Sequence, residues 1–411
     1  MMKQVALGNV VQINPSSIGK SFPFDEIDYI DISSVGTGTL SGTSRIKLKD
    51  APSRAKRLVD HGDTILATVR PNLRSFLFIK NPTPNTVAST GFAVLRAKDI
   101  IDQRYLYYSV TLQSFTDYLS ANVKGAAYPA VDTEAIARGT INLPALTTQQ
   151  KIASILSAYD DLIENNNRRI KILEEMAQAI YREWFVNFRF PGHEKVKMVR
   201  SKLGMMPEGW EVKKLSDIVE TQYGYTESAV EEKIGPKFLR GTDINKASFV
   251  DWDQVPYCKI NEDDYLKYKL RKGDILIIRM ADPGKVGIVE KDIDAIFASY
   301  LIRLNIVSVE ILPYYLFHFL LSDCYQNYII GASTGTTRKS ASAGVVTSID
   351  ILIPPRKLLT VFESQVSMIR SQMNVFLDKN INLRKTRDLL LPKLISGEID
   401  VEGLDIAVEN R

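Results

Sequence analysis

DDLIENNNRRIKILEEM, residues 160–176, places three asparagines and two arginines inside a stretch whose apolar residues otherwise recur at helical spacing. Around this stretch, one row of positions falls every seven residues and a second row lies three residues after the first. The rows are Leu156, Ile163, Ile170 and Ala177, and Tyr159, Asn166, Leu173 and Ile180. This spacing predicts a long amphipathic helix with a seam that faces a partner helix, and it puts Asn166 on that seam.

The chain of 411 residues contains an internal repeat. Three short landmarks occur twice: GDTIL at Gly62 and GDILI at Gly273, YLYY at Tyr105 and YLFH at Tyr315, INLP at Ile141 and ILIP at Ile351. In both copies the third landmark follows the second by 36 residues. Three landmarks in one order, at one offset of about 210 residues, indicate a tandem duplication whose copies have diverged.

The second copy carries a comparable seam at the same offset. Its rows are Val366, Met373, Asn380 and Arg387, and Ile369, Phe376, Leu383 and Leu390. A helix of about 40 residues is about 60 Å long, which exceeds what one domain of about 145 residues can bury, so we expect the two helices to pair.

In an antiparallel pair of equal length, Asn166 and Asn380 would lie near the middle and within reach of each other. A polar residue on a seam costs stability but helps to fix register and oligomeric state. The alternative is that residues 165–167 form a solvated patch or a local break, because asparagine is a poor helix former. Pro392 is expected to kink or end the second helix, and Gly397 supplies a stop signal.

Each copy combines short β-rich runs, such as TILATV and ILIIRM, with a helical segment. The predicted fold class is therefore α+β: two tandem globular domains, each followed by a long helix, with the helices pairing as an antiparallel coiled coil. The predicted segments are a first domain at 1–145, a helix at 146–190, a linker at 191–210, a second domain at 211–355, a helix at 356–397 and a tail at 398–411.

Composition limits the classes of protein to which the chain can belong. Its length and its 45% of hydrophobic residues suffice for two or three separate cores. No apolar run approaches the ~20 residues that cross a bilayer, and the first residues lack a signal-peptide pattern. Cys258 and Cys324 are the only cysteines, which favours a cytoplasmic location, and three histidines without a cysteine cluster argue against a metal site. The net charge of +4 permits nucleic-acid binding without requiring it.

Three stretches resemble the specificity (S) subunit of type I restriction-modification systems. They are LPALTTQQKIASILSAYDDLIENNNRRIKILEEMAQAIYREWFVNFRFPG (143–192), IPPR at the start of the second helix, and RDLLLPKLISGEID near the end. The resemblance implies two target-recognition domains, each reading one half of a bipartite sequence in double-stranded DNA. It also implies that the helices set the spacer between the halves and dock methyltransferase (modification) subunits.

The resemblance implies no catalytic residue and no cofactor in this chain. S-adenosylmethionine is expected on the modification subunits, and ATP on the restriction subunit, which is a translocase and nuclease. The residues agree: GTGTLSG (36–42) does not have the GxGxxG spacing, and GASTGTTRKS (331–340) does not have the register of a phosphate-binding loop. No active site is nominated.

Side chains suited to phosphates and base edges gather in two loops of each copy. The loops are TVRPNLRS (68–75) and NVKGAAYPAVD (122–132) in the first copy, and IIRMADPGK (277–285) and GTTRKSAS (335–342) in the second. The candidate DNA-contacting residues are Arg70, Asn72, Arg74, Lys124, Tyr128, Arg279, Lys285, Arg338, Lys339 and Ser340. The loops correspond through the repeat, as expected if one binding surface was duplicated and then changed.

Several features have two interpretations. A surface arginine or lysine is more often solvated or ion-paired than in contact with a base. Arg54, Lys56 and Arg57 in the basic run 44–57 can contact phosphate or form a solvated face. Tyr223 and Tyr225 can stack on a base or pack in the protein.

The aromatic residues after the first long helix, from Trp184 to Phe190, can form a partner interface or close a local core. Two other functions are also considered. A non-catalytic coiled-coil scaffold would bind protein partners instead of DNA, and a single-chain methyltransferase would bind S-adenosylmethionine itself.

Overall fold

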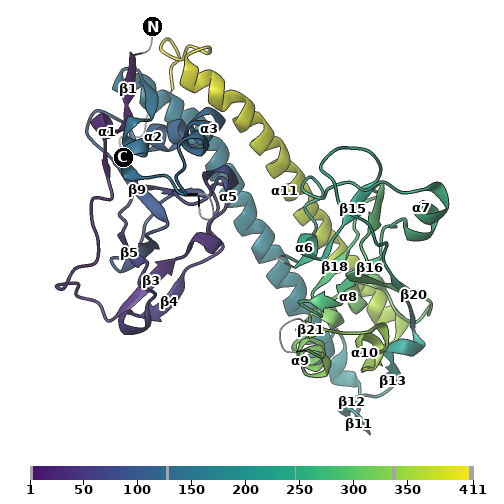
Figure 1. Cartoon of the computed structure of the whole chain (residues 1–411). Coiled ribbons are helices and arrows are strands. Elements are labelled where there is room, and N and C mark those ends of the chain that lie inside the picture. Colours follow the sequence, from purple (N-terminus) through teal and green to yellow (C-terminus); the bar gives the residue numbers. More distant parts are fainter. Residues whose placement is uncertain (1–2, 126–128, 246, 336–338, 407–411) are drawn as a thin grey trace. The chain divides into compact units, whose positions relative to one another are not determined.

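The computed structural model describes residues 3–125, 129–245, 247–335 and 339–406 (Figure 1). The chain divides into two compact units, one formed by Met1–Glu164 with Asn382–Arg411 and the other by Asn165–Ile381. The division passes through both long helices, α5 (Leu146–Tyr181) and α11 (Arg356–Ser396). Each unit therefore holds one globular domain and a part of each helix.

In the first unit, β1 (Lys3–Ala6) pairs antiparallel with β10 (Thr140–Leu143), the strand that leads into α5. The strands of one antiparallel sheet, in spatial order, are β2 (Val11–Ile13), β9 (Phe92–Ala97), β6 (Thr64–Ala67) and β7 (Phe76–Phe78). The strands of the other sheet are β4 (Ser44–Lys47), β3 (Glu26–Ile30), β8 (Thr86–Ser89) and β5 (Ala55–Leu58), with β3 and β8 parallel. The α-helices of this domain are α1 (Leu7–Val10), α2 (Gln103–Val110), α3 (Gln113–Ala121) and α4 (Thr133–Arg138).

The second unit repeats the central part of this arrangement. β13 (Glu211–Lys214) pairs antiparallel with β22 (Asp350–Ile353), as β1 pairs with β10. The equivalent sheet has the order β14 (Val219–Tyr223), β20 (Leu301–Ile306), β16 (Ile275–Ile278) and β18 (Val286–Ile288). The other strand pairs are β15 (Lys237–Leu239) with β19 (Ala295–Phe297), β11 (Met198–Ser201) with β12 (Gly204–Pro207), and β17 (Met280–Ala281) with β21 (Lys339–Ser340). The α-helices are α6 (Gly241–Ile244), α7 (Glu262–Tyr268), α8 (Pro313–Leu321), α9 (Asp323–Ala332) and α10 (Ala343–Thr347).

The sequence landmarks occupy equivalent places, which confirms the predicted duplication. Gly62 and Gly273 have φ angles of 87° and 95°, a left-handed conformation that favours glycine before each central strand. The Tyr105 hydroxyl donates to the backbone oxygen of Asn142 at 2.9 Å, and the Tyr315 hydroxyl donates to that of Leu352 at 2.6 Å. Each tyrosine thereby ties the helix after the sheet to the strand that enters the long helix.

The long helices begin at the predicted positions, and α11 ends one residue before the predicted 397, whereas α5 ends well before the predicted 190. The helical segment predicted at 146–190 consists of α5, which ends at Tyr181, and the single π-helical turn η4 (Arg182–Val186). α11 does not end at Pro392, as the sequence allowed, but runs to Ser396, where Gly397 follows with a φ angle of 80°. Leu394 and Ile395 lie in the core of the first unit, and their burial offsets the hydrogen bond that Pro392 cannot donate.

The aromatic residues after α5 close a local core. Trp184, Phe185 and Phe190 are buried and pack with Trp210 and Phe362 in the second unit. The Phe185 and Phe362 rings lie 4.9 Å apart, centroid to centroid, in an edge-to-face arrangement. This packing selects the core interpretation over an exposed partner interface.

A buried ion pair ties the second globular domain to α11. The Arg370 guanidinium donates to both Glu290 carboxylate oxygens at 2.7 and 2.8 Å and to the hydroxyl and backbone oxygens of Ser248, each at 2.9 Å. Arg370 also lies over the Phe317 ring at 5.1 Å. The side chains of Arg370 and Glu290 are only 1% and 7% exposed, so each charge depends on the other for compensation.

We therefore predict that Glu290→Gln destabilises the protein strongly. Removing the carboxylate leaves the buried guanidinium uncompensated, which costs about 3 kcal/mol of unfolding free energy. Denaturant unfolding measures this loss. The control is Glu175→Gln, which removes the exposed Lys171–Glu175 pair at 3.9 Å and is expected to change the unfolding free energy by less than about 0.5 kcal/mol. Equal effects of the two substitutions would contradict the prediction.

Glu363 on α11 faces the N-terminus of α8. Its carboxylate oxygens accept the Tyr314 amide at 3.2 and 3.1 Å. Burial raises the pKa of Glu363 from 4.5 to about 7, although the amides of Tyr314 and Tyr315 and the charge of Arg356 act in the opposite direction. Between about pH 4.5 and 7 the native state therefore keeps a proton that the unfolded chain has lost.

We predict that the stability difference between wild type and Glu363→Gln depends on pH in this window. The wild type loses stability relative to the variant as pH rises from 4.5 to about 7, because ionisation of the buried carboxyl disfavours the native state. Unfolding curves measured across the window give the difference. Titration of His318, whose pKa burial lowers to about 3, occurs in both proteins and cancels. A constant difference would show that Glu363 titrates normally.

Candidate nucleic-acid interface

In the first copy, backbone pairing brings the two candidate loops together. Val69 forms an antiparallel bridge with Ala130. The Arg70 amide donates to the Pro129 backbone oxygen at 3.0 Å, and the Val131 amide donates to that of Thr68 at 2.9 Å. Residues more than 50 positions apart in sequence thus form one continuous backbone surface.

The second copy pairs its loops in the same way. β17 and β21 place Met280 opposite Ser340 and Ala281 opposite Lys339, and the Ala341 amide donates to the Arg279 backbone oxygen at 2.8 Å. Arg70 and Ala281, which correspond through the repeat, both have left-handed backbones, with φ angles of 49° and 70°. Both copies therefore retain a conformation that non-glycine residues rarely adopt, although the side chain differs.

The candidate side chains of the first copy differ in whether they are exposed or already bound to other residues of the protein. Arg70 and Asn72 are exposed on the loop that contains the short turn η3 (Pro71–Leu73). Arg74 is instead engaged: it donates to the Thr111 backbone oxygen at 2.8 Å and to the Gln113 side chain, and it lies over the Phe76 ring. Lys124 is exposed but paired with Asp132 at 2.5 Å. Tyr128 lies outside the described residues.

A similar difference occurs in the second copy. Lys285 and Lys339 are exposed, and Ser340 is half-buried. Arg279 is half-buried and lies 4.8 Å above the Tyr223 ring, and among the described atoms its Nε has no hydrogen-bond partner. Arg338 lies outside the described residues. Among the described residues of these two loops, Lys285 and Lys339 are thus the exposed candidates, whereas Arg279 is held against an aromatic ring.

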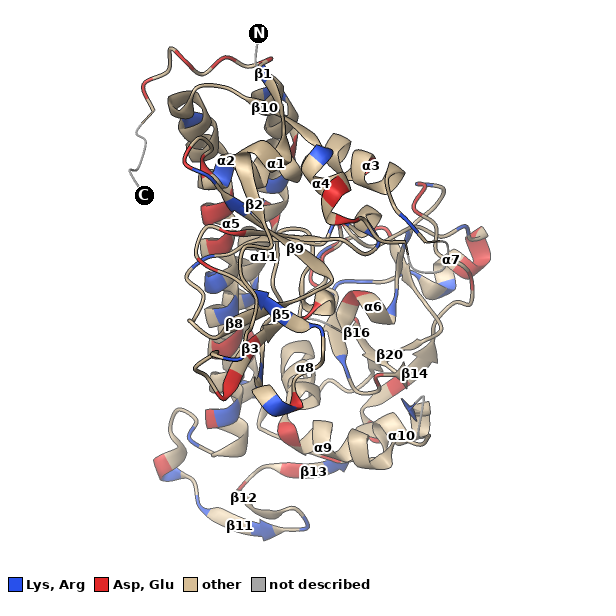
Figure 2. Cartoon of the chain, turned by 60° about the vertical axis from the view of Figure 1, so that its left-hand side comes forward, with Lys and Arg blue, Asp and Glu red and all other residues tan. Residues whose placement is uncertain are grey.

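Most of the other residues that had two interpretations in the sequence contact neighbouring side chains in the structure. Arg54 pairs with Asp31 at 2.8 Å, whereas Lys56 is exposed. Figure 2 shows the colour of Lys and Arg on β5, the strand that carries Lys56. Tyr225 packs on Tyr268 with ring centroids 5.3 Å apart, and Tyr223 lies beneath Arg279 while 43% exposed. Packing therefore accounts for Tyr225, and Tyr223 supports an arginine of the candidate loop.

The two seam asparagines are in direct contact in the second unit. The Asn166 amide nitrogen donates to the Asn380 side-chain oxygen at 2.8 Å, and the Asn380 amide nitrogen donates to the Asn167 side-chain oxygen at 2.9 Å. Asn380 is fully buried and Asn166 is 9% exposed. These hydrogen bonds satisfy amides that would otherwise be costly to bury. A role in fixing helix register remains a prediction.

Sequence reasoning missed how the loops are assembled. No residue pattern predicted the pairing of Val69 with Ala130 or the left-handed conformation of Arg70. The hydrogen bond between Arg74 and Gln113 on α3 was also not predicted. A comparison of the two copies could have given one signal, because both put a short extended segment directly after the central strand.

The part of the chain that the structure describes lacks two features that would indicate other functions. In residues 3–125, 129–245, 247–335 and 339–406, no group of three or more His, Cys, Asp or Glu side chains is placed to hold a metal ion. In the same ranges, no helix has both the length and the apolar character needed to span a membrane.

Comparison with known proteins agrees with the duplicated fold. The profile of the family described as the type I restriction modification DNA specificity domain matches residues 1–175 and 207–358. The chain belongs to this family. The two matches coincide with the two copies of the repeat, so the chain carries two specificity domains in tandem.

Individual specificity proteins are similar over most of their length. The chain is 29% identical over 356 residues to the type I restriction enzyme MjaIX specificity subunit of Methanocaldococcus jannaschii, covering 83% of this chain and 78% of the relative. It is 23% identical to the HindI specificity subunit of Haemophilus influenzae, covering 97% and 99%. The crystal structure of a type I S subunit from M. genitalium superposes with a TM-score of 0.55 at 14% identity, covering 96% of each chain, which supports the shared fold.

For a specificity domain of this family, Arg70 is the clearest test of a phosphate contact. We predict that Arg70→Ala weakens duplex binding by a similar factor for all sequences and reduces the slope of log affinity against log salt by about one. Binding titrations at several salt concentrations measure both. Lys124→Ala is the comparison, because its ion pair with Asp132 already compensates the charge, and its slope is expected to change less. An unchanged slope for Arg70→Ala would remove it from the interface.

Proposed function

We propose that this chain is the DNA-reading, non-catalytic subunit of a type I restriction-modification complex, in which each globular domain contacts one half of a bipartite target. One observation carries the proposal: both copies join equivalent loops through equivalent backbone pairing, Val69 with Ala130 and Met280 with Ser340. A binding surface that is duplicated but carries different side chains suits two half-sites of different sequence.

We further propose that α5 and α11 pair as an antiparallel coiled coil that sets the spacer. Within the first unit, Asp160 pairs with Arg387 at 2.5 Å, and the Asn142 side chain, just before α5, donates to Ile395 at 3.0 Å. Within the second unit, Asn166 contacts Asn380, and Arg169 lies over the Phe376 ring. In both units, later residues of α5 meet earlier residues of α11, which supports the antiparallel direction.

Methyltransferase and restriction subunits are the proposed protein partners. The relatives are named as specificity subunits of restriction enzymes, so the reaction belongs to other subunits of those enzymes. Val361, Met368 and Val375 recur every seven residues on α11 and are 44%, 65% and 48% exposed. An exposed apolar row of this kind supports docking of a modification subunit on the helix. S-adenosylmethionine and ATP would bind to the partners, and the complex would work in the cytoplasm, where the DNA lies.

The test is methylation-sensitive sequencing of genomic DNA from cells that contain the modification subunit, with and without this chain. We expect adenine methylation at one bipartite motif to disappear when the chain is absent. Replacing residues 1–145 with the first domain of a relative should change only one half-site, because each domain reads its own half. No difference between the cells, although the complex assembles, would contradict the proposal. A change in both half-sites after the exchange would contradict independent reading.

A further inference from the structure

The first globular domain contacts α5 at two places along the helix. The first is apolar: Ile152 and Leu156 are fully buried in the core that contains Tyr105 and Leu106. The second lies about 12 Å further along the helix, at the rise of 1.5 Å per residue, and is formed by Asp161 and Glu164. Two separated attachments fix the tilt of a domain on a rod, whereas one attachment leaves a rocking motion.

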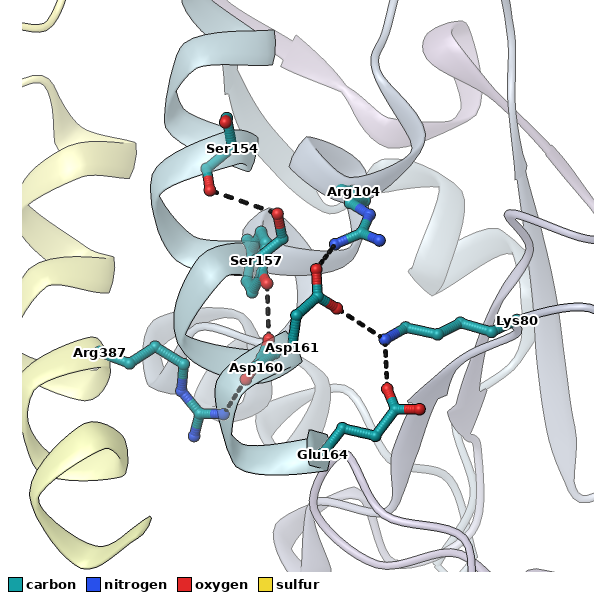
Figure 3. A network of polar contacts seen from close by, with 9 residues as sticks. Lys80, Arg104, Ser154, Ser157, Asp160, Asp161, Glu164 and Arg387 are labelled. Atoms are coloured by element: carbon teal, nitrogen blue, oxygen red, sulfur yellow. Dashed lines mark hydrogen bonds and ion pairs between the residues drawn. The ribbon is translucent and has the colours of Figure 1, made fainter. Parts of the chain in front are cut away.

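The second attachment is ionic (Figure 3). Lys80 contacts Asp161 at 2.9 Å and Glu164 at 2.6 Å, and Arg104 contacts Asp161 at 3.5 Å. The adjacent Asp160 links the domain to α11, since it pairs with Arg387 at 2.5 Å and accepts the Tyr108 hydroxyl at 2.5 Å. This group of residues is the tilt lock.

The tilt lock connects directly to the candidate interface. Lys80 follows β7, and the loop with Arg70 and Asn72 precedes the same strand. A change in the tilt of the domain at Lys80 therefore moves the candidate DNA-contacting loop at the other end of a short, paired strand.

The two domains are attached by ionic contacts of different burial. In the tilt lock, the side chains of Lys80, Asp161 and Glu164 are 34%, 43% and 51% exposed, whereas those of Arg104, Asp160 and Arg387 are 18%, 23% and 22% exposed. The lysine contacts are therefore the part of the tilt lock that salt reaches most readily. In the second domain Lys291, which corresponds to Lys80 through the repeat, pairs with Asp378 of α11 at 2.5 Å. This domain also has the Arg370–Glu290 pair, whose side chains are 1% and 7% exposed. Salt screens exposed ion pairs and has little effect on buried ones.

We propose that the tilt lock is the positioning element that limits the spacer lengths accepted by this protein, and that the first domain is the one whose position yields as salt rises. This inference rests on the proposed function. Lys80 and Arg104 act as positioning residues, because they hold the loop that faces DNA without contacting DNA themselves.

The test uses the complete complex with its modification subunit and three DNA duplexes that share both half-sites. One duplex has the spacer length of the motif methylated in the genome, called the genomic spacer. The other two have spacers that are one base pair shorter and one base pair longer. The readout is the ratio of methylation rates between spacers within one reaction, which cancels general weakening of DNA binding by salt. For the double variant Lys80→Gln with Arg104→Gln, we expect the preference for the genomic spacer to fall about five-fold at low salt, the scale of a few exposed ion pairs. In the wild type, the preference should fall toward the same level as salt rises to about 0.3 M.

Lys291→Gln is the matched control, because it removes the equivalent lysine but leaves the Arg370–Glu290 pair, and its spacer preference should equal that of wild type. Lys80→Arg in place of Lys80→Gln should restore the preference. If the double variant stays as selective as wild type at every salt concentration, or loses all three duplexes equally, the inference is overturned. If the wild-type complex methylates none of the duplexes, the proposed function itself fails.

Discussion

The structure depends on the burial of the end of α11 in the core of the first domain. Leu394 and Ile395 are almost fully buried there together with Ile152 and Leu156 of α5. The helix that begins after the second domain therefore ends within the first unit, while α5 begins in the first unit and ends in the second. Both helices therefore contribute residues to both units.

Hydrogen-bonded polar side chains lie on the seam positions of both helices, and their role in fixing the helix register remains a prediction. Asn166, Asn167 and Asn380 satisfy one another, and a slip of register would leave a buried amide without a partner. The apolar rows alone tolerate such a slip, because one heptad resembles the next. The Arg370–Glu290 pair adds a similar constraint between α11 and the second domain, where a displaced guanidinium would lose its buried compensation. We therefore expect burial to supply most of the stability and these polar contacts to favour one register.

In the candidate interface, the two copies share the backbone arrangement but differ in their side chains. Equivalent pairing in the two copies keeps two loops together, and Arg70 and Ala281 keep the same left-handed backbone. The side chains on this backbone differ, since Arg70 of the first copy corresponds to Ala281 of the second. A constant backbone with variable side chains allows two half-sites to be read by one architecture, because phosphate contacts need position and base contacts need chemistry.

The sequence by itself determined the duplication, the mixed α+β content of the two domains and the starts of the long helices. These depend on local periodicity and on landmarks such as GDTIL and GDILI, whose glycine and strand are short-range features. It also placed Asn166 and Asn380 on seams, because seven-residue spacing is visible without a partner. Only the tertiary structure decided that α11 continues through Pro392, that Trp184 belongs to a core, and that Arg74 is engaged. The reason is physical: each outcome depends on burial against residues distant in sequence, and no local pattern records which distant surface a side chain will meet.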